Sequence, residues 1–176
     1  SWSNKLEEEG VNVIYGIPGY KVHSKICLVT RIEKGKPAYY ACLSTGNFNE
    51  QTAQTYADHT LLTASKRLTG DLLTVFKALN KGALPKGLKH LIVSPVESRP
   101  AIYKLIDNEI ANAKAGKEAY MILKMNSLAD EQLIAKLYQA GRAGVNIKLI
   151  IRGMCCLVPG VKDVSENISA ISIVDK

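Results

Sequence analysis

The chain has 176 residues, of which 47% are hydrophobic and 22% charged, a composition typical of one globular domain or two half-size ones. This composition excludes disordered, collagen-like and coiled-coil proteins, and no apolar run is long enough to form a transmembrane helix. The net charge of +7, from 23 Lys and Arg against 16 Asp and Glu, favours an anionic partner: nucleic acid, a phosphorylated substrate or an acidic membrane surface. With only 6% aromatic residues, a stacking platform for single-stranded nucleic acid is disfavoured.

Neither the first residues nor the cysteines indicate a secreted or zinc-binding protein. Residues 1–9 are polar and acidic, unlike a secretory signal. The cysteines form no CxxC pair and have no histidine at zinc-finger spacing; they are Cys27, Cys42, Cys155 and Cys156. We therefore expect reduced thiols in a cytoplasmic protein.

The first half of the chain predicts the end of a helix followed by strands. The helix is expected to stop at Gly10. Strands are expected over residues 11–15, 22–31, 38–44 and 60–62, with the third returning antiparallel to the second. From Thr69 to Gly82 the apolar period becomes helical.

The second half alternates strands with helices. It is expected to hold strands at 91–93, 120–123, 147–151 and 171–174, with helices around 102–110 and 133–138. Such alternation calls for a parallel sheet with helices on its faces. The fold class expected is therefore α/β in two units, each a mixed sheet with flanking helices, over 1–82 and 89–176, with a linker at 83–88.

The two units begin and stop at different points of their α/β repeat. The first starts near the end of a helix, and the second stops directly after a strand. We therefore expect both units to be incomplete pieces of a longer protein. The alternative is a complete small domain that has an ordinary amino-terminal helix.

The strand predicted over 22–31 carries a histidine and a lysine two positions apart. Because strand side chains alternate, His23, Lys25 and Cys27 would share one face, with neighbouring positions on that face about 7 Å apart along the strand. A neutral imidazole can attack phosphorus, and a nearby ammonium can offset the charge of a transferring phosphoryl group. Taken alone, a histidine on a strand is more often structural.

A polar loop, Ser44-Thr45-Gly46-Asn47-Phe48-Asn49, follows the strand that returns beside His23. Gly46 would let backbone N–H groups approach an anion, and Thr45 and Asn47 can donate from their side chains. An ordinary turn closed by its own side chains is an equal alternative at this point.

Three runs of sequence resemble the polyphosphate kinase family: GIPGYKVHSKICLVTR, STGNFNEQTAQTYADHTLLTA and IKLIIRGMCCLVPG with ISAISIVDK. The resemblance covers essentially the whole chain. More distantly, H-x-K followed by a G-x-N loop is similar to the phospholipase D superfamily, in which two repeated halves share one active site. The resemblance thus implies two phospholipase D-like units.

The resemblance assigns roles to the residues of the two motifs. His23 matches the histidine that becomes phosphorylated, and Lys25 matches its phosphate-stabilising companion. Thr45 and Asn47 match the accompanying phosphate-binding loop.

Two further positions match residues that contact ATP. Tyr56 matches a tyrosine, and Arg152 an arginine just past a strand. A guanidinium at the carboxyl end of a parallel strand suits bidentate phosphate contacts. The alternatives are a half-buried tyrosine ring and a solvated charge at a strand end.

Several parts of the family pattern are missing. A second histidine, the proposed acid–base partner, would lie beyond residue 176, and arginines of the magnesium–phosphate site would precede Ser1. His59 and His90 do not fall at motif positions. The resemblance implies Mg²⁺ bound with ATP, with no metal ligand among these residues, and little or no turnover by this chain alone.

The leading hypothesis is a piece of an enzyme that reversibly transfers the γ-phosphate of ATP to inorganic polyphosphate through a phosphohistidine at His23. ATP, ADP and polyphosphate would be the partners, without nucleic acid, and the parent would be a homo-oligomer that has no transmembrane segment. One alternative is a phospholipase D-like phosphodiesterase, but Arg31 stands where such enzymes carry an aspartate. The other is a noncatalytic polyanion-binding module.

Overall fold

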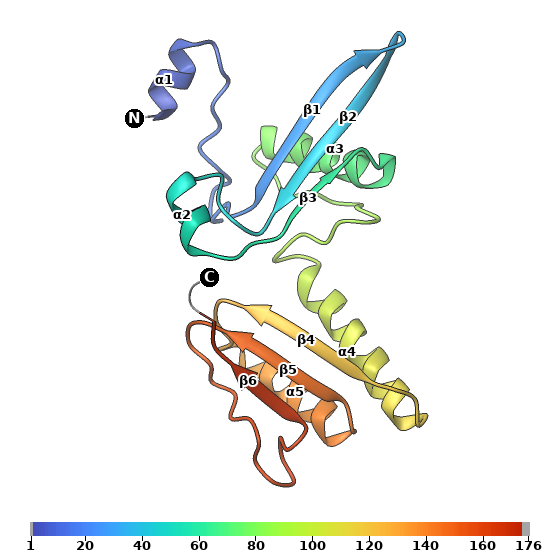
Figure 1. Ribbon diagram of the computed structural model, residues 1–176. Coiled ribbons are helices and arrows are strands. Elements are labelled where there is room, and N and C mark those ends of the chain that lie inside the picture. Colours follow the sequence, from blue (N-terminus) through green and yellow to red (C-terminus); the bar gives the residue numbers. More distant parts are fainter. Residues whose placement is uncertain (1, 174–176) are drawn as a thin grey trace. The chain divides into compact units, whose positions relative to one another are not determined.

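The computed structural model describes residues 2–173, which form two units that divide between Val93 and Ser94. Each unit has its own sheet and helices (Figure 1). The predicted α/β class with two sheets and flanking helices is confirmed. Each sheet is of one type rather than mixed, because the described strands of the first are all antiparallel and those of the second all parallel.

The sheet of the first unit is built on a hairpin of β1 (Lys25–Glu33) and β2 (Lys36–Ser44), with β3 (Thr60–Thr63) beside β2. The two turn residues, Lys34 and Gly35, have φ of 50° and 75°. Two positive φ values are the mark of a type I′ turn, whose twist matches that of the paired strands. The predicted antiparallel return is therefore confirmed.

Helix α3 (Lys66–Asn80) packs on one face of this sheet. Its buried residues and the inward residues of the hairpin form the core: Ala41, Leu72 and Val75, surrounded by Ile26, Leu28, Leu43, Phe76 and Leu79. Since Ile26 and Leu28 point to α3, Lys25 and Cys27 lie on the opposite face of β1. The face opposite α3 therefore carries Lys25, one of the predicted site residues.

Residues 91–93 do not form the strand that was predicted after the linker. Leu91 and Val93 instead pack against the core of the first unit, together with Leu88. The Asp71 carboxylate accepts hydrogen bonds from three successive N–H groups in this segment, those of Lys89, His90 and Leu91, at 2.9, 2.6 and 2.9 Å. The segment is thus fixed to α3.

Asp71 should make the stability of the first unit depend on acid. Desolvation pushes the pKa of Asp71 upward, but the three N–H donors outweigh it and hold the pKa below its usual value. Its contribution is therefore present above the usual pKa of about 3.9 and lost as pH falls through the lower, folded-state pKa. The free energy of unfolding should therefore fall below about pH 4, and we expect this fall to be smaller in Asp71→Asn than in the unmodified chain. Urea unfolding monitored by circular dichroism at several pH values measures it. The same loss of stability at low pH in both proteins would contradict this.

In the second unit, β4 (Tyr120–Met125), β5 (Asn146–Ile151) and β6 (Ile168–Ile171) form a parallel sheet in that order. Helices α4 (Ser98–Lys114) and α5 (Glu131–Arg142) contribute to one buried core with the sheet. Its fully buried members include Ile106, Leu137, Ala140, Val145, Ile147, Leu149 and Ile168. The predicted βαβ order is confirmed.

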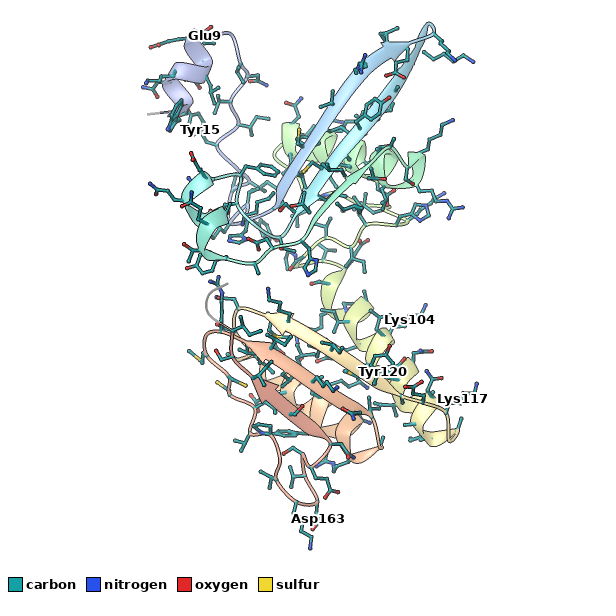
Figure 2. All side chains as sticks on the ribbon, viewed as in Figure 1. Glu9, Tyr15, Lys104, Lys117, Tyr120 and Asp163 are labelled. Atoms are coloured by element: carbon teal, nitrogen blue, oxygen red, sulfur yellow. The ribbon has the colours of Figure 1, made fainter. Side chains whose placement is uncertain are left out.

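The other face of this sheet is open within residues 2–173. Tyr120, labelled in Figure 2, and Ile122 are 58% and 59% exposed on β4. Parallel sheets are normally covered on both faces.

An ion pair links the two helices of the second unit. Arg99 of α4 donates from both terminal nitrogens to the Asp130 carboxylate, at 2.9 and 2.6 Å. Asp130 also caps α5 by accepting from the Leu133 N–H at 2.8 Å. The Arg99 hydrogen bond is the main reason that the pKa of Asp130 is lowered to about 2, so the carboxylate stays charged at neutral pH.

Other predicted elements also differ from those of the structure. Residues 11–15 follow helix α1 (Trp2–Glu8) but form no strand, because no described strand pairs with them. Helix α2 (Glu50–Thr55) was not predicted. The strand predicted over 171–174 is shifted, since β6 ends at Ile171 and residue 174 lies outside the described residues.

No helix among residues 2–173 combines the length and apolar character needed to cross a membrane.

Candidate functional site

His23 lies two residues before β1 rather than inside the strand predicted over 22–31. The ladder begins with Lys25 opposite Ser44, and no described strand pairs with residues 21–24. Even so, the Lys25 ammonium lies 2.8 Å from His23 Nδ1 and 3.1 Å from Nε2, and it donates to the His23 carbonyl oxygen at 2.8 Å. Lys25 therefore folds back on His23 instead of standing beside it on the pleat.

This contact places a positive charge beside both ring nitrogens of His23. The Lys25 ammonium also brings N–H donors close to these nitrogens, the atoms that could attack phosphorus. The His23 ring is exposed, so an incoming phosphate can reach it. A phosphoryl group on either nitrogen would lie beside the positive charge of Lys25, which suits charge that develops on its oxygens.

The loop after β2 begins beside this pair, because Ser44 is the register partner of Lys25. Thr45 Oγ1 donates to Asp58 Oδ1 at 3.0 Å and accepts from the His59 N–H at 3.0 Å. The Thr45 N–H donates to the His59 carbonyl oxygen, also at 3.0 Å. The single hydroxyl proton of Thr45 is thus directed at Asp58, and a phosphate could accept it only after this hydrogen bond opens.

Asp58, which lies between α2 and β3, contacts this loop and was not predicted from the sequence as a site residue. A Cβ at Gly46 would lie 2.2 Å from Asp58 Oδ2, so only glycine fits beneath this carboxylate. The Gly46 N–H donates to Ser44 Oγ at 3.1 Å, and that hydroxyl also bonds Thr60 Oγ1 at 2.9 Å. Asp58 lies 12 residues after Gly46, outside the six-residue polar loop, and the pairing of β2 with β3 helps to bring the two together.

The remaining loop residues flank α2. Asn47 is exposed at the loop. Asn49 caps α2 by accepting from the Thr52 N–H at 3.0 Å. Tyr56 ends the helix, with its N–H bonded to the Thr52 carbonyl oxygen at 3.0 Å and its side chain facing solvent in part.

Arg152 lies in the second unit, at the carboxyl end of β5. This is the end of a parallel sheet where ligands bind in α/β proteins. The two residues that follow Arg152 tie the loops after β4 and β5 together: the Gly153 N–H donates to the Asn126 carbonyl oxygen at 2.7 Å, and the Leu128 N–H donates to that of Met154 at 2.8 Å. Arg152 therefore begins a loop of fixed shape.

Gly153 has no room for a side chain, which gives a stability prediction. A Cβ there would lie 2.8 Å from the Asn126 carbonyl oxygen and 2.8 Å from Ser127 Oγ. Since a backbone atom must shift, we expect Gly153→Ala to lower the free energy of unfolding of the second unit by about 1–3 kcal/mol. Denaturant unfolding measures the loss, with Gly70→Ala as the control, because that glycine of α3 has open space around it and no positive φ. Equal losses would contradict this reading.

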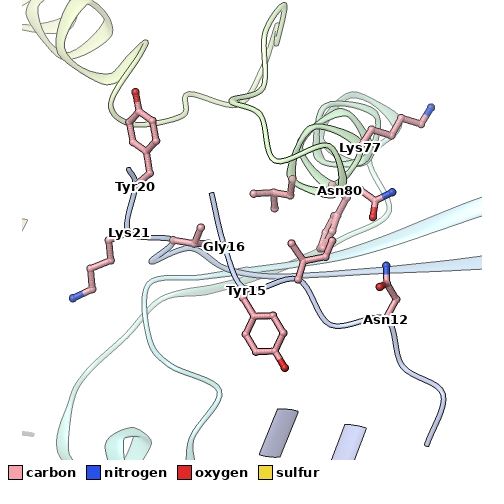
Figure 3. A pocket seen from close by; sticks show the side chains of 11 residues that line it. Asn12, Tyr15, Gly16, Tyr20, Lys21, Lys77 and Asn80 are labelled. Carbon is pink, nitrogen blue, oxygen red and sulfur yellow. The ribbon is translucent and has the colours of Figure 1, made fainter. Parts of the chain in front are cut away.

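An open hollow of the first unit lies away from these residues. It has a volume of about 910 Å³ and is open to solvent, between residues 12–22 and the end of α3. Tyr20 and Lys21 line it from the first segment, and Lys77 and Asn80 from the helix (Figure 3). None of the predicted site residues lines it.

Two descriptions of known families match the chain. "Polyphosphate kinase C-terminal domain 1" matches residues 1–85, and "Polyphosphate kinase C-terminal domain 2" matches residues 91–176.

Individual proteins agree with this match. The polyphosphate kinases of Vibrio cholerae and Escherichia coli K12 are 53% and 45% identical to the chain over 175 residues, which is 99% of the chain and 25% of each relative. The crystal structure of the Porphyromonas gingivalis polyphosphate kinase superposes with a TM-score of 0.86 at 43% identity, covering 98% of this chain and 29% of that one. The chain thus spans about a quarter of the length of its curated relatives.

Proposed function

Because the chain belongs to the polyphosphate kinase family, we propose that it carries part of a site that transfers the γ-phosphate of ATP to inorganic polyphosphate, with His23 as the nucleophile. The observation that supports this proposal is the Lys25 ammonium at 2.8 and 3.1 Å from the two ring nitrogens of His23. The other family members are named as kinases, so the parent activity is that of a transferase.

The reaction proceeds in two transfers. An unprotonated ring nitrogen of His23 attacks the γ-phosphorus of ATP, the bond to the bridging oxygen breaks, and ADP leaves. A terminal oxygen of polyphosphate then attacks the phosphorus, the phosphorus–nitrogen bond breaks, and the ring nitrogen regains its lone pair. Lys25 stabilises the negative charge of the phosphoryl oxygens in both transfers. The same steps in reverse return phosphate to ADP.

The surrounding residues hold the phosphates. Asn47 would contact the phosphoryl group beside His23, and the Gly46 N–H and the Thr45 hydroxyl would join it once their hydrogen bonds to Ser44 and Asp58 open. Tyr56 and Arg152 would contact ATP, with the guanidinium of Arg152 forked onto phosphate oxygens.

Magnesium is assigned no protein ligand in this chain. Residues 2–173 include no group of three or more His, Cys, Asp or Glu side chains that could hold a metal ion. We expect Mg²⁺ to arrive with the phosphates of ATP.

The net charge of +7 predicts polyanion binding that depends steeply on salt. Polyphosphate that releases counterions on binding should lose roughly tenfold or more in affinity between about 50 and 200 mM salt. Titration of the chain with fluorescently labelled polyphosphate at several salt concentrations measures the slope. An affinity independent of salt would remove this explanation of the basic composition.

A chimaera tests the proposed function directly. These 176 residues would replace the matching 175-residue segment of the Vibrio cholerae polyphosphate kinase, to which they are 53% identical. We expect the chimaera to make acid-insoluble polymer from ATP, and the 176-residue chain alone to give little or none. A folded chimaera that binds polyphosphate without making polymer would support a binding module instead.

A further inference from the structure

Two cysteines face each other on the hairpin that carries Lys25. Cys27 of β1 and Cys42 of β2 are register partners, and both thiols are free. Cys27 is exposed and Cys42 is partly buried. Both lie on the sheet face opposite α3, because their neighbours Ile26, Leu28 and Ala41 pack on the core.

The type I′ turn sets the spacing of this pair. In a hairpin with a two-residue turn, the residues that flank the turn, here Glu33 and Lys36, exchange backbone hydrogen bonds. Hydrogen-bonded and non-hydrogen-bonded pairs alternate from there, and Cys27 is six residues from Glu33, so Cys27 and Cys42 form a hydrogen-bonded pair. Pro37, which has no N–H, falls in a non-hydrogen-bonded pair, as this count requires.

The expected separation suits a disulfide that would form under slight strain. The Cα atoms of a hydrogen-bonded pair lie about 5.5 Å apart, within the usual range for disulfides. The Cβ atoms of opposed residues lie about 4.5–5.5 Å apart, whereas a disulfide brings them to about 3.5–4.5 Å. Closing the bond would therefore draw the two Cβ atoms, and with them β1 and β2, together by up to roughly 2 Å, and strained disulfides are the readily reduced ones.

The next pair along the same face is Lys25 and Ser44. Lys25 contacts His23, and Ser44 leads into the loop at Thr45 and accepts the Gly46 N–H. A change in strand separation at Cys27 and Cys42 would thus act at the neighbouring pair of this face, which adjoins both His23 and the loop at Thr45.

We infer that Cys27 and Cys42 form a reversible disulfide in the presence of a small-molecule disulfide such as oxidised glutathione. The exposed Cys27 thiolate attacks one sulfur of the oxidant and releases one thiol. The Cys42 thiolate then attacks the Cys27 sulfur of the mixed disulfide and releases the second thiol. Two protein thiols are oxidised, one disulfide of the oxidant is reduced to two thiols, and excess dithiol reverses the reaction.

The first test follows the bond in the chain itself. Incubation with oxidised glutathione should lower the count of free thiols from four to two in the unmodified chain, and from two to none in the Cys155→Ser/Cys156→Ser variant. Peptide mapping without reduction should join the peptides that contain Cys27 and Cys42, with the loss of two hydrogen atoms. Glutathione retained on Cys27, a link to Cys155 or Cys156, or a disulfide between two chains would each overturn the inference.

The second test, which rests on the proposed function, follows the effect on activity in the Vibrio cholerae chimaera. Oxidation should lower polymer synthesis by roughly tenfold or more, because a shift of about 1 Å in catalytic groups can cost on the order of 10²-fold. Dithiothreitol should restore it, and Cys27→Ser should be active and insensitive to the oxidant. A mapped Cys27–Cys42 bond with unchanged synthesis would refute this regulation, while an inactive reduced chimaera would count against the proposed function and leave the disulfide result standing.

Discussion

His23→Ala in the chimaera is expected to abolish polymer synthesis, with a loss of roughly 10³-fold or more, because no covalent intermediate can form without the ring nitrogen. The uptake of label from γ-labelled ATP should disappear with it. Polyphosphate binding should change little, since the alanine leaves the lysine and arginine charges in place. Filter-binding assays and polymer synthesis measure the two effects separately.

His90→Ala is the matched control for this variant. His90 is exposed in the first unit, and only its backbone N–H takes part in the bond to Asp71. We expect this variant to keep its polymer synthesis. Equal losses for the two histidines would mean that the assay reports folding rather than a nucleophile at His23.

Lys25→Ala is expected to lower the rate of phosphoryl transfer by about 10²–10³-fold, with a smaller effect on KM, because Lys25 stabilises charge that develops in the transition state. The contacts to Nδ1 and Nε2 at 2.8 and 3.1 Å are the basis for this expectation. Single-turnover transfer from labelled ATP to His23 gives the rate, and saturation curves give KM.

Lys21→Ala removes the same charge nearby and serves as the control. Lys21 lines the open hollow and not the candidate site. We expect nearly full activity in Lys21→Ala and partial recovery in Lys25→Arg, which keeps the charge in a different geometry. A loss in Lys21→Ala as large as that in Lys25→Ala would point to net charge, not to the contact with His23.

The elements that the sequence predicts well are those with strong local signals. The hairpin of β1 and β2 has a two-residue turn with glycine, and α5 has a regular apolar period with Asp130 as its cap. Local pattern also predicted that His23 and Lys25 would act together. It placed both on one strand, whereas β1 begins only at Lys25, because strand pairing starts with the Lys25–Ser44 pair.

The parts that were missed depend on contacts between distant residues. Residues 11–15 alternate like a strand, but a strand also requires a partner, and no described strand pairs with them. Residues 91–93 have the composition of a strand, but the Leu91 N–H donates to the Asp71 carboxylate instead of to a neighbouring strand. The role of Asp58 beside Thr45 follows from the pairing of β2 with β3, which no motif in the loop reveals.

The central claim is that a phosphoryl group becomes bonded to a ring nitrogen of His23. The most direct measurement is mass spectrometry of the chimaera, quenched in alkali after brief incubation with ATP and without polyphosphate. We predict one phosphate that is stable in base, labile in acid and located by fragmentation on His23, and that disappears when polyphosphate is added. A chimaera that makes polymer while its phosphate lies on another residue, or on none, would contradict the account.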